Sequence, residues 1–313
     1  MKTTTRFATC RLILVLCLCA LPSYGWQDAH DLDRDDATAL LVERHSEPAA
    51  QERTEENAIA GAFAFANGDG TELLVTDQNA SEQDAVVKTF SKAVCPGNKV
   101  FEVRYAGHQS SSKKNSGRDV SRNFTNVAGS VFHIIEGAGA VKADEHCLVA
   151  SAAYMKDRRP LPMKVAVRQD QPVSAPRCDA RTQGGLRRQQ GRAPVDCWQL
   201  AQIDPDGRLL AVLYEPHGKD LLAALVLEIG KEHFVYEMPA RADAASSWRE
   251  GDGGQFDPAT LAPLFVLQND RDGSWDVGIS WAGEEGADLS VYRSASASRL
   301  KKVVSGYVYW YPE

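Results

Sequence analysis

The sequence predicts an α+β fold that is mostly antiparallel β, with sandwich- or barrel-like sheets and one amphipathic helix near residues 82–94. Short runs rich in β-branched and aromatic residues recur along the chain, and turn signals of Gly, Pro and Asp separate them. The connections are too short for the helical crossovers that parallel strands need. The fold class therefore follows from strand spacing, turn chemistry and one strong helical signal.

The helical signal lies in the first half of the chain. A capping box begins at Ser81 and includes Asp84, and the apolar residues Val86, Phe90 and Val94 recur at every fourth position. A Pro-Gly pair follows and would end the helix. This pattern predicts a helix over about residues 82–94.

The strand candidates are runs with period-2 alternation or high β-branched content. In the first half they cover residues 71–76, 100–105, 131–136, 147–154 and 163–168. In the second half they cover residues 198–203, 208–214, 222–227, 233–238, 264–267, 275–281, 289–293 and 303–311.

The first residues of the chain have the pattern of a secretory signal peptide. Within residues 1–25, Lys2, Arg6 and Arg11 precede an apolar run over residues 12–21, and small residues follow. The run is about half the ~20 residues that a transmembrane helix needs, and we expect no transmembrane segment. We expect an exported protein, periplasmic or secreted after the signal peptide is removed.

The rest of the chain divides by composition. Residues 26–57 are acidic and poor in apolar side chains, so we expect a flexible extension there. Residues 58–196 form an α+β half that contains a basic loop region, and residues 197–313 form an aromatic-rich antiparallel β half. The sequence leaves open whether the two halves form one continuous domain.

Cysteine usage predicts two disulfides. Removal of residues 1–25 deletes three of the seven cysteines and leaves an even set in an oxidising compartment. We expect Cys178 to pair with Cys197 and Cys95 with Cys147, because near neighbours close smaller loops. No tight Cys-x-x-Cys pair is present, so we expect no metal at these thiols.

Charge is unevenly distributed along the chain. Without the signal peptide, 32 basic residues stand against 42 acidic ones, which disfavours nucleic acid as a partner. Residues 156–192 are the exception, with ten Lys and Arg against three Asp. A disulfide would staple part of this segment into an exposed arginine loop, suited to carboxylates or phosphates on a partner. The alternative is a solvated loop that balances the acidic body or docks on the acidic extension. The binding candidates are Arg177, Arg181, Arg187, Arg188 and Arg192.

Aromatic residues gather near the C-terminus. In the last predicted strand, Tyr307, Tyr309 and Tyr311 share one face and Trp310 lies on the other. Only one face of a two-layer sheet must be core, so one set would suit sugar stacking or a protein interface. Core packing is the alternative explanation.

Three polar residues form the nearest approach to a catalytic group. His133, Asp144 and His146 flank a glycine-containing turn, and a hairpin there would bring the histidines together as a general base or metal site. His133 also alternates with Val131 and Ile135, which instead predicts a histidine on an apolar core face.

Two Asp/Gly turns resemble the calcium loops of integrin-type propeller repeats, one starting at Asn67 and one at Asp270. The resemblance implies calcium ligation by carboxylates, with Asp270, Asp272 and Asp276 as the candidates in the second turn. Ordinary hairpin turns also use Asp and Gly, for positive φ.

The remaining motifs of common enzymes are absent from the sequence. It contains no Gly-x-Ser-x-Gly elbow, no His-Glu-x-x-His and no Gly-rich phosphate loop, and we expect no cofactor. We therefore expect a non-enzymatic, inhibitor- or immunity-type binding protein of the cell envelope or extracellular space, which recognises a protein or glycan. The alternatives are a secreted hydrolase of envelope polymers that uses the His/Asp/His group, and a calcium-stabilised β-repeat protein.

Overall fold

The structure is a computed structural model that describes residues 61–80, 84–166, 178–242, 248, 256–295 and 298–310. These residues lie in one compact unit, Asn57–Glu313. The expected signal peptide and acidic extension lie outside the described residues. Two sheets make up the unit, and almost all of their strand pairs are antiparallel, as the sequence predicted.

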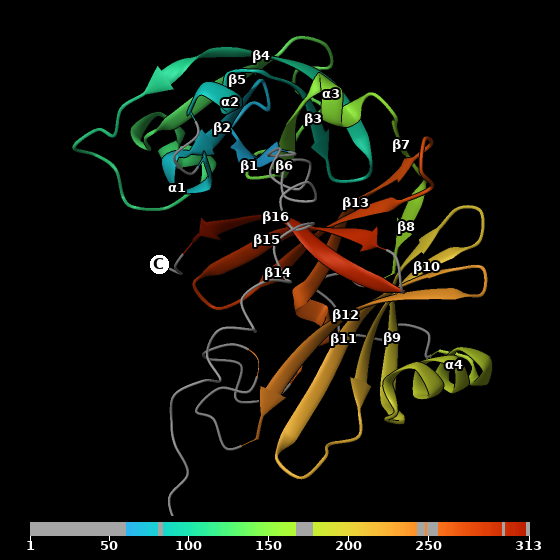
Figure 1. Ribbon diagram of the computed structural model, residues 1–313. Coiled ribbons are helices and arrows are strands. Elements are labelled where there is room, and N and C mark those ends of the chain that lie inside the picture. The colour runs from blue at the N-terminus through green and yellow to red at the C-terminus, as the bar shows by residue number, and fades with distance from the viewer. Residues whose placement is uncertain are drawn as a thin grey trace, which may run out of the picture. The chain divides into compact units, whose positions relative to one another are not determined.

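The first sheet is a closed six-stranded barrel with the order β1-β2-β5-β4-β3-β6 (Figure 1). Its interior holds alternate residues of each strand, including the small side chains Ala62, Ala64 and Ala66. Cys95 and Cys147 form a disulfide between two paired strands, as predicted. The strands are β1 (Gly61–Ala66), β2 (Glu72–Thr76), β3 (Phe90–Cys95), β4 (Lys99–Gln109), β5 (Gly129–Ile134) and β6 (His146–Ser151). The short helices among them are α1 (Asp77–Ala80), α2 (Asp84–Val87) and η1 (Ser121–Asn126).

The predicted helix over residues 82–94 is wrong. Only α2 is helical among the described residues of that range, and the second half of the range is strand β3. β3 pairs with both β4 and β6 and so closes the barrel. Tertiary pairing of the strand outweighs the local helical periodicity of Val86, Phe90 and Val94.

The second sheet has ten strands in the order β7-β13-β14-β15-β16-β12-β11-β10-β9-β8. Each strand predicted in the second half of the chain corresponds to one of its strands, although β16 ends at Tyr309 and residue 311 lies outside the described residues. The helix α3 (Ala152–Met155) connects the barrel to this sheet, and η2 (Pro258–Thr260) precedes β13. The strands are β7 (Arg158–Pro160), β8 (Met163–Val165), β9 (Pro194–Ile203), β10 (Gly207–Tyr214), β11 (Asp220–Ile229), β12 (Glu232–Arg241), β13 (Leu261–Asn269), β14 (Trp275–Ala282), β15 (Gly286–Ala295) and β16 (Arg299–Tyr309).

One short segment joins the two ends of this sheet. β7 pairs with β13 at one end, and β8 pairs with β9 at the other. Only Leu161 and Pro162 separate β7 from β8, and the N–H of Leu161 donates to the carbonyl of Val266. The sheet therefore curls back on itself.

The curled sheet buries both of its faces. A large apolar cluster that includes Leu200, Leu225 and Val277 lines one face. On the other face, the residues of β13–β16 pack with barrel residues such as Phe63 and Leu148. Strands β9–β12 carry a separate cluster that includes both Cys178 and Cys197 and the helix α4 (Ala180–Gln190) through Leu186. Within the described part of the chain, no helix has the length and apolar character needed to cross a membrane.

Candidate functional site

The basic segment expected to be a loop is largely the helix α4, which lies beside β9 (Figure 1). Asp179 caps its start by accepting a hydrogen bond from the N–H of Thr182 at 2.8 Å, which holds the pKa of Asp179 below its usual value. Gly191 ends it in the left-handed conformation, with its N–H donating to the carbonyl of Arg187. These caps outweigh the two glycines inside the segment. The interpretation of residues 178–197 as a loop is therefore wrong.

The predicted disulfide between Cys178 and Cys197 is confirmed and joins the residue before the helix cap to β9. Leu186, on the inner face of α4, is fully buried. Gln189 donates from Nε2 to the carbonyls of His233 and Ser298, at 3.3 and 3.2 Å. The helix is thus fixed to the sheet at its start, middle and end.

The arginines of α4 face solvent. Arg181, Arg187 and Arg188 are exposed, and none has an ion-pair partner among the described residues. Arg192 follows the helix, is half-buried, and donates from Nη1 to the carbonyl of Asp220 at 3.2 Å. Arg177 lies outside the described residues.

A buried carboxylate lies beneath α4. Glu228 of β11 is 6% exposed, and its Oε1 accepts from Nε of Arg208 at 2.8 Å. Its Oε2 accepts from the hydroxyl of Thr182 at 2.9 Å and lies 3.0 Å from Nε2 of His233. Arg208 also pairs with Asp179, with 3.3 Å between Nη2 and Oδ2. This network connects the first turn of α4 to β10, β11 and β12.

A groove of about 480 Å³ runs between α4 and the turn that joins β11 to β12. Arg181, Gly185 and Arg188 line the helix side, and Lys231 and His233 line the turn side. A second hollow of about 440 Å³ adjoins it, because both share Arg181 and Lys231.

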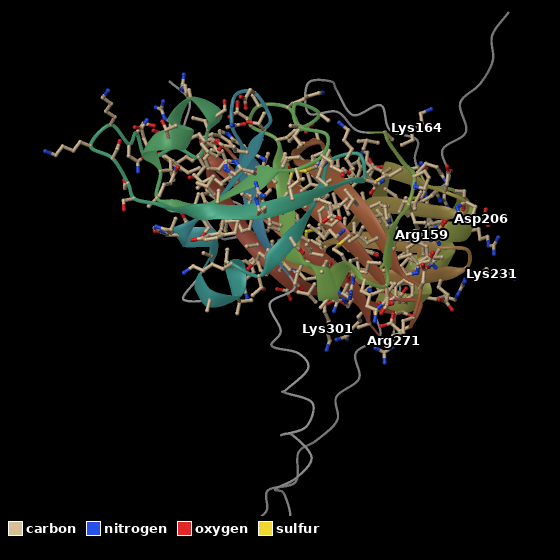
Figure 2. The ribbon with its side chains drawn as sticks, turned by 90° about the horizontal axis from the view of Figure 1, so that it is seen from above. Arg159, Lys164, Asp206, Lys231, Arg271 and Lys301 are labelled. Atoms are coloured by element: carbon tan, nitrogen blue, oxygen red, sulfur yellow. A yellow bond between two sulfur atoms is a disulfide. The ribbon has the colours of Figure 1, made fainter. Side chains whose placement is uncertain are left out.

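Gly185 is required for this close packing. A Cβ atom at this position would lie 2.7 Å from Cε1 of His233. Asp206 and Lys231 both line the second hollow, and Figure 2 shows their side chains at the same edge of the view.

The lining of the groove carries charges of both signs. Its cations are Arg181, Arg188, Arg208 and Lys231, and its acids are Asp179, Glu228 and Glu232. Arg208, Asp179 and Glu228 neutralise one another in part through the network beneath the helix. The exposed cations Arg181, Arg188 and Lys231 have no such ion pair in the part of the chain that is described.

The structure does not bring the predicted His/Asp/His group together. β5 pairs with β2 and β4, whereas β6 pairs with β1 and β3, so His133 and His146 do not lie on a shared hairpin. His133 is exposed, with Nδ1 3.1 Å from Oε1 of Glu72. Asp144 accepts a hydrogen bond from the N–H of Ser121. The alternative of a core histidine at position 133 is also wrong, because Phe132 and Ile134 are the inward residues of that strand.

The calcium candidates have other partners. Asp276 is 2% exposed and accepts from Nε of both Arg158 and Arg293 at 2.7 Å and from the hydroxyl of Tyr154 at 2.7 Å. Asp270 pairs with Arg159, at 3.5 Å between Nε and Oδ1. Asp272 accepts from the N–H of Ser274 at 2.8 Å, as in an ordinary turn. Among the residues that the structure describes, no three His, Cys, Asp or Glu side chains gather as metal ligands would.

The C-terminal aromatics are only half-exposed. Trp310 packs against the cluster shared by β13–β16 and the barrel, and its ring centroid lies 6.4 Å from that of His146. Tyr307 packs over Gly286 in the neighbouring strand. Tyr309 is half-buried, and Tyr311 lies outside the described residues.

Sequence reasoning missed four residues of the site: Arg208, Glu228, Lys231 and His233. One signal was available, because Glu228 ends the apolar run over residues 221–227 at a position that β11 buries. A carboxylate at a buried position of a strand needs a cation or donors nearby. The partners themselves come from separate elements, and no local pattern identifies them.

Comparison of the chain with protein-family models, with curated proteins and with solved structures finds no match in any of the three.

Proposed function

We propose that this protein is an exported, non-enzymatic binding protein that recognises an acidic partner, a protein or a glycan, through the arginine face of α4. One observation carries the proposal. Arg181, Arg187 and Arg188 are exposed on a helix that a disulfide and hydrogen bonds hold in place, without ion-pair partners among the described residues. Because the helix backbone is already fixed, only the arginine side chains lose conformational entropy when they bind a carboxylate.

Export to the periplasm or the extracellular space is supported by two features. The four cysteines of the described residues form two disulfides, and such bonds persist in oxidising compartments. Residues 1–25 have the composition of a signal peptide.

The test is a charge-reversal pull-down. The variant Arg181→Glu/Arg187→Glu/Arg188→Glu should lose partners that the wild-type protein captures from an envelope or secreted fraction. The matched control is Lys88→Glu/Lys113→Glu/Lys114→Glu, which reverses three exposed lysines of the barrel half and makes the same change in net charge.

A captured partner must also rebind the purified wild-type protein. The control variant should retain such partners. Equal capture by the wild-type protein and the α4 variant contradicts the proposal.

A further inference from the structure

We propose that the partner is a protein, and that the groove beside α4 receives one of its acidic side chains between Arg181, Arg188 and Lys231. Arg187 lies on the same helix but does not line the groove. The inference rests on the proposed function and adds the class of partner and the point of contact.

The groove has cations available for a ligand. Arg208 is occupied by Glu228 and Asp179, whereas Arg181, Arg188 and Lys231 are exposed and without ion pairs among the described residues. The buried carboxylate of Glu228 already accepts hydrogen bonds from three side chains, so it does not need a further cation. Arg181, Arg188 and Lys231 are therefore available to bind a carboxylate of another molecule.

The spacing on α4 suits a single inserted side chain. Arg181 and Arg188 are seven residues apart, about 10 Å along a helix axis, and both line the groove. Gly185 lies between them and has no side chain to fill the space. Two long arginine side chains can therefore approach one carboxylate from either side, in the paired geometry that guanidinium groups favour.

The mixed charge of the lining favours a protein over a uniform polyanion. Glu232 lies at the groove and Asp206 at the adjoining hollow, and both are exposed. A sulfated or uronic-acid glycan carries negative charge at every repeat and would meet these carboxylates. A protein surface can place an acid at the arginines and a neutral or basic residue at Glu232 and Asp206.

The experiment uses the full chain and measures the dissociation constant of a short blocked peptide of alternating Glu and Ala at low salt, where exposed charges are least screened. Arg181→Gln, Arg188→Gln and Lys231→Gln should each weaken binding about threefold or more. Arg187→Gln, on the same helix but outside the groove, should weaken peptide binding less than Arg188→Gln does. Lys88→Gln, at an exposed lysine of the barrel half, is the matched control and should change binding by less than about twofold. Glu232→Gln should strengthen binding, since it removes from the groove a negative charge that repels the acidic peptide.

Three results would overturn the inference. Equal weakening by Arg187→Gln and Arg188→Gln would mean that the peptide follows the general charge of the helix. Unchanged binding in Glu232→Gln would place the peptide elsewhere. Tighter binding of a heparin-derived oligosaccharide than of the peptide, lost in the same groove variants, would assign the groove to a glycan.

Failure of the inference and failure of the proposed function give different results. If the α4 variant loses partners in the pull-down but Arg187→Gln weakens their binding as much as Arg188→Gln does, the proposed function is supported and the binding site in the groove is contradicted. If the peptide binds in the groove but the α4 variant captures the same partners as the wild type, the groove site is supported and the proposed function is contradicted. Unchanged melting temperatures establish that the single variants fold.

Discussion

Asn79 in α1 binds the backbone of Tyr307 in β16, with 2.9 Å between its Oδ1 and the N–H nitrogen. Its Nδ2 also donates to the carbonyl of Phe63 in β1 at 3.4 Å. Asp119 repeats the arrangement at Tyr309: its Oδ2 accepts from the N–H of Tyr309 at 3.2 Å, and its own N–H donates to the carbonyl at 2.9 Å. The side chains of Asn79 and Asp119 thus accept hydrogen bonds from backbone N–H groups of β16 that would otherwise be free to pair with another strand.

Replacement of Asn79 should destabilise the protein. Asn79→Ala leaves the N–H of Tyr307 without its acceptor, and we expect a loss of about 1–2 kcal/mol in the free energy of unfolding. Urea denaturation measures this change. Gln78→Ala, at the exposed neighbouring position, should stay within about 0.5 kcal/mol of the wild type. Equal effects of the two variants would show that the bond to Tyr307 contributes nothing.

The two adjacent glycines of α4 should respond to alanine with opposite signs. At Gly184 a Cβ meets only Nη1 of Arg188, at 3.6 Å, so Gly184→Ala should stabilise the protein by up to about 1 kcal/mol through helix propensity. At Gly185 the same atom would lie 2.7 Å from the ring of His233. Gly185→Ala must displace that ring from Glu228, and we expect a loss of about 1–3 kcal/mol.

Thermal melts of the two glycine variants give the comparison directly. A stabilising Gly185→Ala would mean that α4 does not pack against His233 as described.

His146 should make stability depend on pH. Its Nε2 is buried without a hydrogen-bond partner in the described part of the protein, and burial lowers its pKa to about 4. The unfolded chain binds this proton near its usual pKa of about 6.5. Between these two values the unfolded state holds more protons, so this contribution to stability is lost as the pH falls, by up to about 3 kcal/mol.

Denaturation of the wild type and of His146→Phe across this pH range tests the assignment. The variant should show a flatter dependence, whereas His217→Phe, at an exposed turn, should keep the slope of the wild type. If the pH dependence of stability in His146→Phe equals that of the wild type, another group is responsible for it.

The two disulfides should have separable effects. In the loop-entropy model, removing Cys178–Cys197, with 19 residues of separation, costs about 3 kcal/mol, and removing Cys95–Cys147, with 52, costs about 4 kcal/mol. Only the first bond fixes α4, so Cys178→Ser/Cys197→Ser should also weaken peptide binding. Cys95→Ser/Cys147→Ser should lower the free energy of unfolding without weakening peptide binding. Urea denaturation measures the stability of both variants. If only Cys95→Ser/Cys147→Ser weakened peptide binding, α4 would not be part of the binding surface.

The sequence predicted most strands because their periodicity and turn chemistry are local. The pairing of the strands depends on distant contacts, and the errors arose there. β5 and β6 are consecutive strands with a short connection, which suggested a hairpin, but the closed barrel places two other strands between them in either direction. The helix over residues 82–94 failed for the same reason, since β3 is needed to complete the barrel.

The candidate site was predicted only in part. The cysteine pairing could be predicted because each cysteine pairs with its neighbour in the order of the four, and the arginines because they cluster within residues 177–192. The helical state of the segment depends on the Asp179 cap, a signal that the sequence does carry. Arg208, Glu228 and His233 come from three strands and meet only in the folded sheet.

The segment that joins the two ends of the curled sheet also sets an order of assembly. All six barrel strands lie between Gly61 and Ser151, so the barrel can complete its pairing early in synthesis. β7 must wait for β13, because Pro160 pairs with Leu267, about a hundred residues further along the chain. β16 is synthesised last, when the barrel and Asn79 beside it can already be folded. The folded first half of the chain can then provide the surface against which the strands of the second half pair and pack.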